Sequence, residues 1–179
     1  MRITSTTFTS KVAAYQQPLR QFGSLDLVPR EWLHITVQGV AHVHAVTNTQ
    51  RDRLVQAVSQ RLASIPPPRL TFSRPVLHRE AVAIPPTDPA PLAAIQHAIR
   101  AGIEVSYGVA EGDPETFRPH VSVAYVNAPA DVAPVRAALD AVQAEPAEAL
   151  ISHLSLIELH RDNRMYEWTT VATVALGAA

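Results

Sequence analysis

Two hydrophobic patterns alternate along the chain: apolar residues at helical spacing, and apolar residues at every second position, which is typical of a β-strand. The helical pattern predicts four helices, over residues 11–22 and 48–64 and from Asp88 and Asp131 onward. The alternating pattern predicts seven strands, over residues 2–9, 33–40, 69–77, 80–84, 120–126, 149–159 and 165–176. The order strand–helix–strand therefore occurs twice, with extra strands, which predicts a mixed α and β chain.

Residues that begin helices and form turns separate these segments. Residues with side chains that can cap a helix precede three of the helices: Thr47 or Asn48, Asp88, and Asp131. Residues 161–164 predict a hairpin turn between the last two strands, in which Asn163 tolerates a left-handed conformation.

Two of the predicted strands resemble each other and predict an internal duplication. Residues 33–37 read Leu-His-Ile-Thr-Val, and residues 119–123 read Pro-His-Val-Ser-Val. Each segment follows a loop and stands before a helix, and about half the chain separates the two copies. The sequence therefore predicts two halves, each with one His-x-Thr or His-x-Ser strand.

Length, composition and charge limit the classes of protein. A chain of 179 residues can bury a substantial core, and we expect one bilobal domain over residues 1–179. With 47% apolar residues the chain is not disordered, and its apolar runs are too short to cross a membrane. Residues 1–10 lack the apolar core of a secretory signal, so a cytoplasmic bacterial protein is expected. The formal charge of −1 argues against a long nucleic-acid footprint, but it allows a small or terminal phosphate ligand.

The matched histidines can carry acid–base chemistry. Because residues i and i+2 of a strand share a face, His34 projects with Thr36 and His120 with Ser122. If the halves pack symmetrically, two imidazoles and two hydroxyls meet in one cleft. One imidazole can then accept a proton from an attacking water while the other protonates a leaving oxygen. The hydroxyls can hold phosphate oxygens where charge develops in the transition state.

Other histidines give weaker signals. His153 also belongs to a His-x-Ser unit and is a candidate for the wall of the cleft, although a role in ordinary strand packing is the alternative. His42 and His44 could present two imidazoles together, but no third zinc ligand stands nearby in sequence. We therefore expect no metal site, and with no cysteines the chain has neither a thiolate zinc site nor a cysteine nucleophile.

Residues 32–40 (Trp-Leu-His-Ile-Thr-Val-Gln-Gly-Val) and 118–125 (Arg-Pro-His-Val-Ser-Val-Ala-Tyr) resemble the two signatures of the two-histidine (2H) phosphoesterases, and in particular the 2′-5′ RNA ligase-like branch. Residues 161–168 also resemble bacterial members, so the resemblance covers essentially the whole chain. It implies a bilobal α+β fold in which two antiparallel sheets face a central cleft, with helices outside. It also implies catalysis by two histidines without a metal or nucleotide cofactor.

Carried over residue by residue, the resemblance makes His34 and His120 the acid–base pair and Thr36 and Ser122 the phosphate-holding hydroxyls. Many members that process RNA ends have Arg where this chain has Tyr125, which puts specificity for RNA ends in doubt.

Three further residues are candidates for contact with substrate. Gln38 shares a strand face with His34, so it can read a base or sugar, and a polar strand end is its alternative role. Tyr125 lies on the opposite face from His120, and a bulge or the strand end would be needed to bring it to the ligand. Trp32 can stack on a base.

The leading hypothesis from the sequence is a phosphodiesterase that opens the 2′,3′-cyclic phosphate of an RNA end or small nucleotide to a 2′-phosphate. A 2′-5′ RNA ligase, or an enzyme that cleaves 2′-5′-linked or cyclic oligonucleotides, could use the same residues. A binding module that holds a nucleotide or RNA end without turnover is the alternative from another class. The chain is expected to act as a monomer, with no membrane partner.

Overall fold

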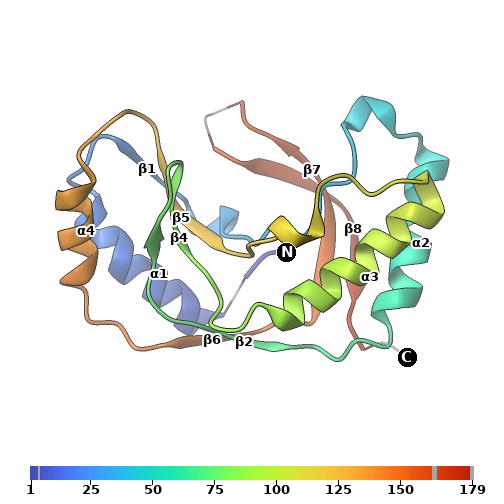
Figure 1. Cartoon of the computed structure of the whole chain (residues 1–179), viewed down its shortest axis with the longest axis horizontal. Helices are drawn as coiled ribbons and strands as arrows, with labels where there is room; N and C mark the ends of the chain where they lie inside the picture. Colours follow the sequence, from blue (N-terminus) through green and yellow to red (C-terminus); the bar gives the residue numbers. More distant parts are fainter. Residues whose placement is uncertain (4, 163–164, 178–179) are drawn as a thin grey trace.

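The computed structural model describes residues 1–3, 5–162 and 165–177 (Figure 1). Its α-helices are α1 (Thr6–Leu19), α2 (Asn48–Leu62), α3 (Ala90–Tyr107) and α4 (Val132–Asp140). Short 3-10 helices are η1 (Arg30–Trp32), η2 (Val43–Ala45) and η3 (Pro114–Thr116). Its strands are β1 (Leu25–Leu27), β2 (Arg69–Phe72), β3 (Val76–Leu77), β4 (Ala81–Ile84), β5 (Val121–Val126), β6 (Ala147–Leu150), β7 (His153–His160) and β8 (Glu167–Ala175).

The strands pair antiparallel throughout the described residues. One sheet has four strands in the order β1-β5-β4-β3, and β2-β6 and β7-β8 form two-stranded sheets. In Figure 1, α1 and α4 lie with the four-stranded sheet on one side, α2 and α3 lie with β7 and β8 on the other, and β2 and β6 run between them. The predicted α+β class with antiparallel sheets is confirmed. The assignment of the chain to one bilobal domain stays a prediction.

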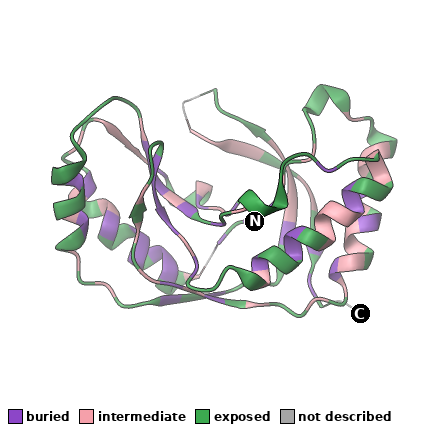
Figure 2. Cartoon of the chain, in the orientation of Figure 1, coloured by how far each residue is buried: buried purple, intermediate pink, exposed green. Residues whose placement is uncertain are grey.

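In Figure 2, buried residues gather on β4, β5 and the inner faces of the helices, which together form the core. The outer faces of the helices are exposed. One cluster of buried side chains joins the four-stranded sheet to α1 and to residues of β7 and β8. Among the described residues, no helix has both the length and the apolar composition needed to cross a membrane.

The predicted strand over residues 2–9 is wrong beyond its first residues. Helix α1 begins at Thr6, and the Ser5 hydroxyl accepts a hydrogen bond from the Phe8 backbone N–H. Four large side chains at helical spacing are buried on one face of α1: Phe8, Val12, Tyr15 and Leu19. The run of Ser and Thr hid this face, since these residues favour helix starts as well as strands. Among the described residues of this segment, Arg2 is the one that pairs as a strand does, through an isolated bridge to His34.

Two long predicted strands are each divided between sheets. Residues 69–77 separate into β2, which pairs with β6, and β3, which pairs with β4. Pro75 lies in the break, and proline cannot donate a backbone hydrogen bond to a ladder. Residues 149–159 separate into β6 and β7 in the same way. Strand β1 was not predicted, because three residues are too few to show an alternating pattern.

Helices α2 and α3 begin and pack as the sequence predicted in outline. Thr47 forms a capping box with Gln50 at the start of α2. Asp88 accepts a hydrogen bond from the Ala90 N–H at 2.9 Å, although the helix proper begins one residue later than the pattern indicated. The two helices approach closely at Gly102, where a Cβ atom would lie 2.7 Å from Val58 Cγ2 and 3.3 Å from the Val58 Cα.

We expect Gly102→Ala to lower the free energy of unfolding by about 1–2 kcal/mol, because the strain of overpacking exceeds the gain in helix propensity. Chemical denaturation measures this change. Gly23→Ala is the matched control, because a Cβ there meets nothing within 4 Å. In a Val58→Ala background the cost of Gly102→Ala should shrink. Equal free energies of unfolding for Gly102→Ala and Gly23→Ala would show that the helices do not meet at Gly102.

Candidate active site

The first histidine lies on an extended segment whose side chains alternate as predicted. Leu33, Ile35 and Val37 are buried, while His34 is half-buried and Thr36 is exposed on the other face. The predicted ladder over residues 33–40 is wrong in part, since within the described chain this segment pairs through the isolated bridge of His34 with Arg2. The three buried apolar side chains therefore fix the direction of the imidazole.

Both imidazoles of the predicted pair are held by the same local hydrogen bond. His34 Nδ1 lies 2.8 Å from the Trp32 carbonyl oxygen, and His120 Nδ1 lies 2.8 Å from the Arg118 carbonyl oxygen. A carbonyl oxygen only accepts, so Nδ1 carries the hydrogen in both rings. This leaves Nε2 of each ring to exchange a proton with a ligand. The repeated contact, two residues back in each case, agrees with the predicted internal duplication.

The environments of the two histidines differ. Burial lowers the pKa of His34 below its ordinary value of 6.5; the hydrogen bond to Trp32 opposes this shift, and the positive charges of the terminal amine and of His120 add to it. The edge of the Trp168 ring, with its centroid 5.0 Å from that of His34, contributes to this burial. His120 is exposed, and its ring centroid lies 5.8 Å from that of His78 in the turn between β3 and β4. A neutral His34 at pH 7 is therefore suited to accept a proton.

A β-bulge in β5 places Tyr125 on the face of Ser122. Ala83 on β4 pairs with Ser122, whereas the preceding Val82 pairs with Ala124, so Val123 is an extra residue in β5. The residues on either side of the bulge thereby return to one face. An interaction with the Ser122 side chain agrees with this geometry; it opposes the effect of burial, which raises the pKa of Tyr125.

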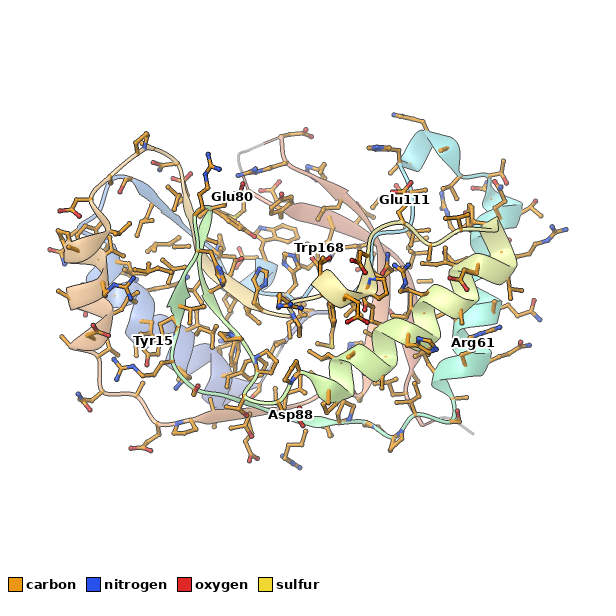
Figure 3. The ribbon with its side chains drawn as sticks, in the orientation of Figure 1. Tyr15, Arg61, Glu80, Asp88, Glu111 and Trp168 are labelled. Carbon is orange, nitrogen blue, oxygen red and sulfur yellow. The ribbon has the colours of Figure 1, made fainter. Side chains whose placement is uncertain are left out.

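Trp32 packs on a second tryptophan beside His34. The rings of Trp32 and Trp168 meet edge to face with centroids 4.8 Å apart, and both side chains are half-buried. Figure 3 labels Trp168, which lies in the middle of the molecule between the two groups of elements. The two indoles form an aromatic wall next to the His34 imidazole. Contact of Trp32 with a substrate base stays a prediction.

Gln38 is placed differently from the expected base-reading role, because the protein already uses its amide. Its Nε2 donates to the carbonyl oxygens of Gly39 and Glu111, both at 2.9 Å. Its Oε1 accepts from Gln96 at 3.3 Å and from Arg100 at 3.2 Å. Gln38 thus ties the first histidine segment to α3 and to the loop after it, which fits the alternative structural role.

His153 does not join the other candidates. It is exposed at the start of β7, where its Nδ1 lies 3.2 Å from the Ser152 hydroxyl. The residue that pairs with Trp168 is Leu159, at the far end of the same strand. Six residues of strand separate His153 from that point, which is about 20 Å. The His-x-Ser unit of His153 does lie on a strand, as predicted. The direction of β7, however, places His153 at the end of the strand away from Trp168 and His34.

Two cavities border the first motif. One of about 420 Å³ is lined by His34 and Thr36 together with apolar side chains of α2, β7 and β8. The other, of about 410 Å³, lies between Thr36 and the residues that precede the second histidine, including Phe117 and Arg118. Thr36 thus borders both cavities, and the cleft shared by the two histidines stays a prediction.

His78 was not found by the sequence reasoning. It contacts His120 from a turn, and no motif spacing links residues so far apart in the chain.

Comparison with known proteins gives the family. The sequence profile described as the 2′-5′ RNA ligase superfamily matches residues 8–163. The chain belongs to the 2′-5′ RNA ligase superfamily. The resemblance to 2H phosphoesterases is thereby confirmed, and membership of this superfamily supports a phosphodiesterase-type activity. A search of curated proteins finds no match.

Solved structures of the superfamily fold are similar over nearly the whole chain. TT0787 of Thermus thermophilus is 18% identical with a TM-score of 0.73, covering 98% of this chain and 95% of that chain. E. coli LigT in apo form is 14% identical with a TM-score of 0.68, covering 97% and 94%. The MHV ns2 PDE domain is 14% identical with a TM-score of 0.56, covering 94% and 91%. At these identities the likeness shows the fold alone.

Within this member of the superfamily, we expect Trp168→Ala to raise the pKa of His34 toward 6.5, because removal of the indole exposes the imidazole to water. Trp168→Phe, which keeps an aromatic ring, should change it less. NMR titration of the imidazole signals measures both values. A His34 midpoint that Trp168→Ala leaves unchanged would contradict this assignment.

The lowered pKa of His34 also predicts how the stability of the wild type depends on pH. As pH falls, the unfolded chain binds the proton of this imidazole first, so the free energy of unfolding should decrease from pH 6.5 down to the folded pKa of His34.

Proposed function

We propose that the chain is a metal-independent phosphodiesterase that opens 2′,3′-cyclic phosphates of RNA ends or small nucleotides to 2′-phosphates. The observation that carries the proposal is the pair of matched imidazoles, each with Nδ1 donating to a backbone carbonyl at 2.8 Å and Nε2 left for the ligand. Two imidazoles of this kind supply both proton transfers of the reaction. Binding alone does not require two titratable groups in such matched positions.

The proposed reaction assigns one proton transfer to each histidine. His34 Nε2 takes a proton from water as the water oxygen forms a bond to phosphorus, which suits the lowered pKa of His34. The bond from phosphorus to the ribose 3′ oxygen breaks, and His120 Nε2 donates its proton to that oxygen. The product carries a 2′-phosphate and a free 3′-hydroxyl. A second pair of transfers returns His34 and His120 to their starting protonation states through water.

The hydroxyls of Thr36 and Ser122 are proposed to donate hydrogen bonds to the phosphate oxygens that do not break. Thr36 is exposed on the same face as His34, and Ser122 stands two residues after His120. Donors fixed in position before the reaction stabilise the developing charge without reorganisation.

Small nucleotides are the favoured substrates within this class. Structures of E. coli LigT have been determined in complex with 3′-AMP and with ATP, so a fold of this kind accommodates a nucleotide in that protein. The near-neutral charge of this chain also favours a small ligand over a long polyanion. The ligase direction and the cleavage of 2′-5′-linked or cyclic oligonucleotides use the same groups, and analysis of products on defined substrates distinguishes them.

We expect His34→Ala and His120→Ala each to lower the turnover of nucleoside 2′,3′-cyclic monophosphates by about 10²- to 10⁴-fold, because each removes one proton transfer. The wild type should keep its activity in EDTA and show a bell-shaped dependence of kcat/KM on pH between about 5 and 9. Chromatography against 2′- and 3′-monophosphate standards identifies the product. His153→Ala is the matched control, since its imidazole is exposed far from the aromatic wall.

Several results would contradict the proposal. Near-normal turnover by either alanine variant would remove that histidine from the mechanism. Activity lost in EDTA would point to a metal-dependent reaction instead. Nucleotide binding without turnover, undiminished in His34→Ala, would favour the binding module.

A further inference from the structure

One arginine reaches the second motif from the other end of the chain. Arg161 follows directly after β7, and its guanidinium carbon lies 5.8 Å from the ring centroid of Tyr125 and 5.0 Å from that of Tyr166. The two tyrosine rings meet edge to face, with centroids 5.5 Å apart. Arg161 after β7 and Tyr166 before β8 thereby contact β5 through a cation that lies against two aromatic rings.

Tyr125 connects this cation to the phosphate-holding hydroxyl. The bulge at Val123 puts Tyr125 on the face of Ser122, and the two side chains interact. The guanidinium that covers the Tyr125 ring therefore stands one phenol ring away from the Ser122 hydroxyl.

The guanidinium of Arg161 is free to take an anion. Among the described residues it makes no hydrogen bond and no ion pair, and the side chain is exposed. Arg118, which stands closer in sequence to His120, is engaged: its Nη1 donates to the carbonyl oxygens of Glu115 at 2.8 Å and Phe117 at 2.9 Å. Arg161 is therefore the better placed of the two to leave its contacts for a ligand.

In the proposed reaction, His120 begins protonated and is the one group of the acid–base and hydroxyl set that carries a positive charge. The lowered pKa of His34 leaves this imidazole neutral at pH 7, and the hydroxyls of Thr36 and Ser122 are neutral donors. A phosphodiester carries one negative charge, and the product monoester carries more. Guanidinium groups bind phosphate oxygens through two parallel hydrogen bonds, which are about twice as strong as bonds between neutral groups.

We propose that Arg161 is a substrate-binding residue that holds phosphate oxygens beside Ser122, with the rings of Tyr125 and Tyr166 positioning its guanidinium. The inference rests on the proposed function in that the phosphate lies between the two histidines. Its ligand class is a phosphate monoester or diester of a nucleoside, and the phosphate rather than the base makes the contact.

Calorimetric titration with adenosine 2′-monophosphate and with adenosine tests the contact without any turnover. We expect Arg161→Met, which keeps an apolar stem over the rings, to weaken binding of adenosine 2′-monophosphate at least tenfold and to leave adenosine unaffected. Arg161→Lys, which keeps the charge but not the planar fork, should fall between the wild type and Arg161→Met. Arg53→Met, at an exposed arginine on α2, is the matched control and should bind like the wild type.

A second variant separates charge from structure. Tyr125→Arg in the Arg161→Met background places a guanidinium on β5, on the face of Ser122, and should recover most of the lost affinity. Equal binding of adenosine 2′-monophosphate by Arg161→Met and the wild type would overturn the proposal. A loss shared equally by adenosine, or no binding of adenosine 2′-monophosphate by the wild type, would also overturn it.

The same variants distinguish this inference from the proposed function. Arg161-dependent binding in a protein that hydrolyses no cyclic phosphate would support the contact and contradict the proposed function. Hydrolysis of cyclic phosphates with the same KM in wild type and Arg161→Met would support the function and overturn the contact.

Discussion

The arrangement of the site depends on one hydrogen bond that is made twice, from an imidazole Nδ1 to the carbonyl oxygen two residues earlier. It fixes the ring plane of His34 and His120 and directs the opposite nitrogen of each ring away from the backbone. The bond requires an extended backbone, which burial of Leu33, Ile35 and Val37 provides on the first segment. Strand β5 provides it on the second. The alternating apolar residues of each motif therefore position an imidazole as well as filling the core.

The two copies of this contact lie in unlike surroundings, which turns a symmetric motif into an asymmetric site. His34 lies against Trp168 and is half-buried, so its pKa is lowered. His120 is exposed beside His78. Two proton-transfer groups with different tasks need different environments, and pKa values separated by burial are a usual way to obtain them. The sequence could not assign base and acid in the proposed reaction, because the burial of His34 involves Trp168, which lies more than a hundred residues from it in the chain.

The sequence correctly predicted the features that depend on residues close together in the chain. The starts of α2, α3 and α4 follow from capping residues, and the shared face of His34 and Thr36 follows from alternation. Contacts between distant segments could not be predicted from periodicity, since the saturation of Gln38 depends on where α3 packs. The expected left-handed turn at Asn163 lies outside the described residues. Family membership came from motif resemblance and is confirmed, whereas the roles of individual site residues stay predictions.

The bulge in β5 shows how one extra residue changes which side chains a strand offers. Without Val123 as an unpaired residue, strict alternation would turn Tyr125 toward the core and away from Ser122. With it, Val123 and Ala124 are both buried, and the phenol of Tyr125 returns to the face of the hydroxyl. Arg161, directly after β7, packs on the aromatic surface so created. Strand β5 carries no charged side chain itself, and the positive charge beside it comes from Arg161. The position of that charge depends on the register of β5, because the bulge sets where the ring of Tyr125 lies.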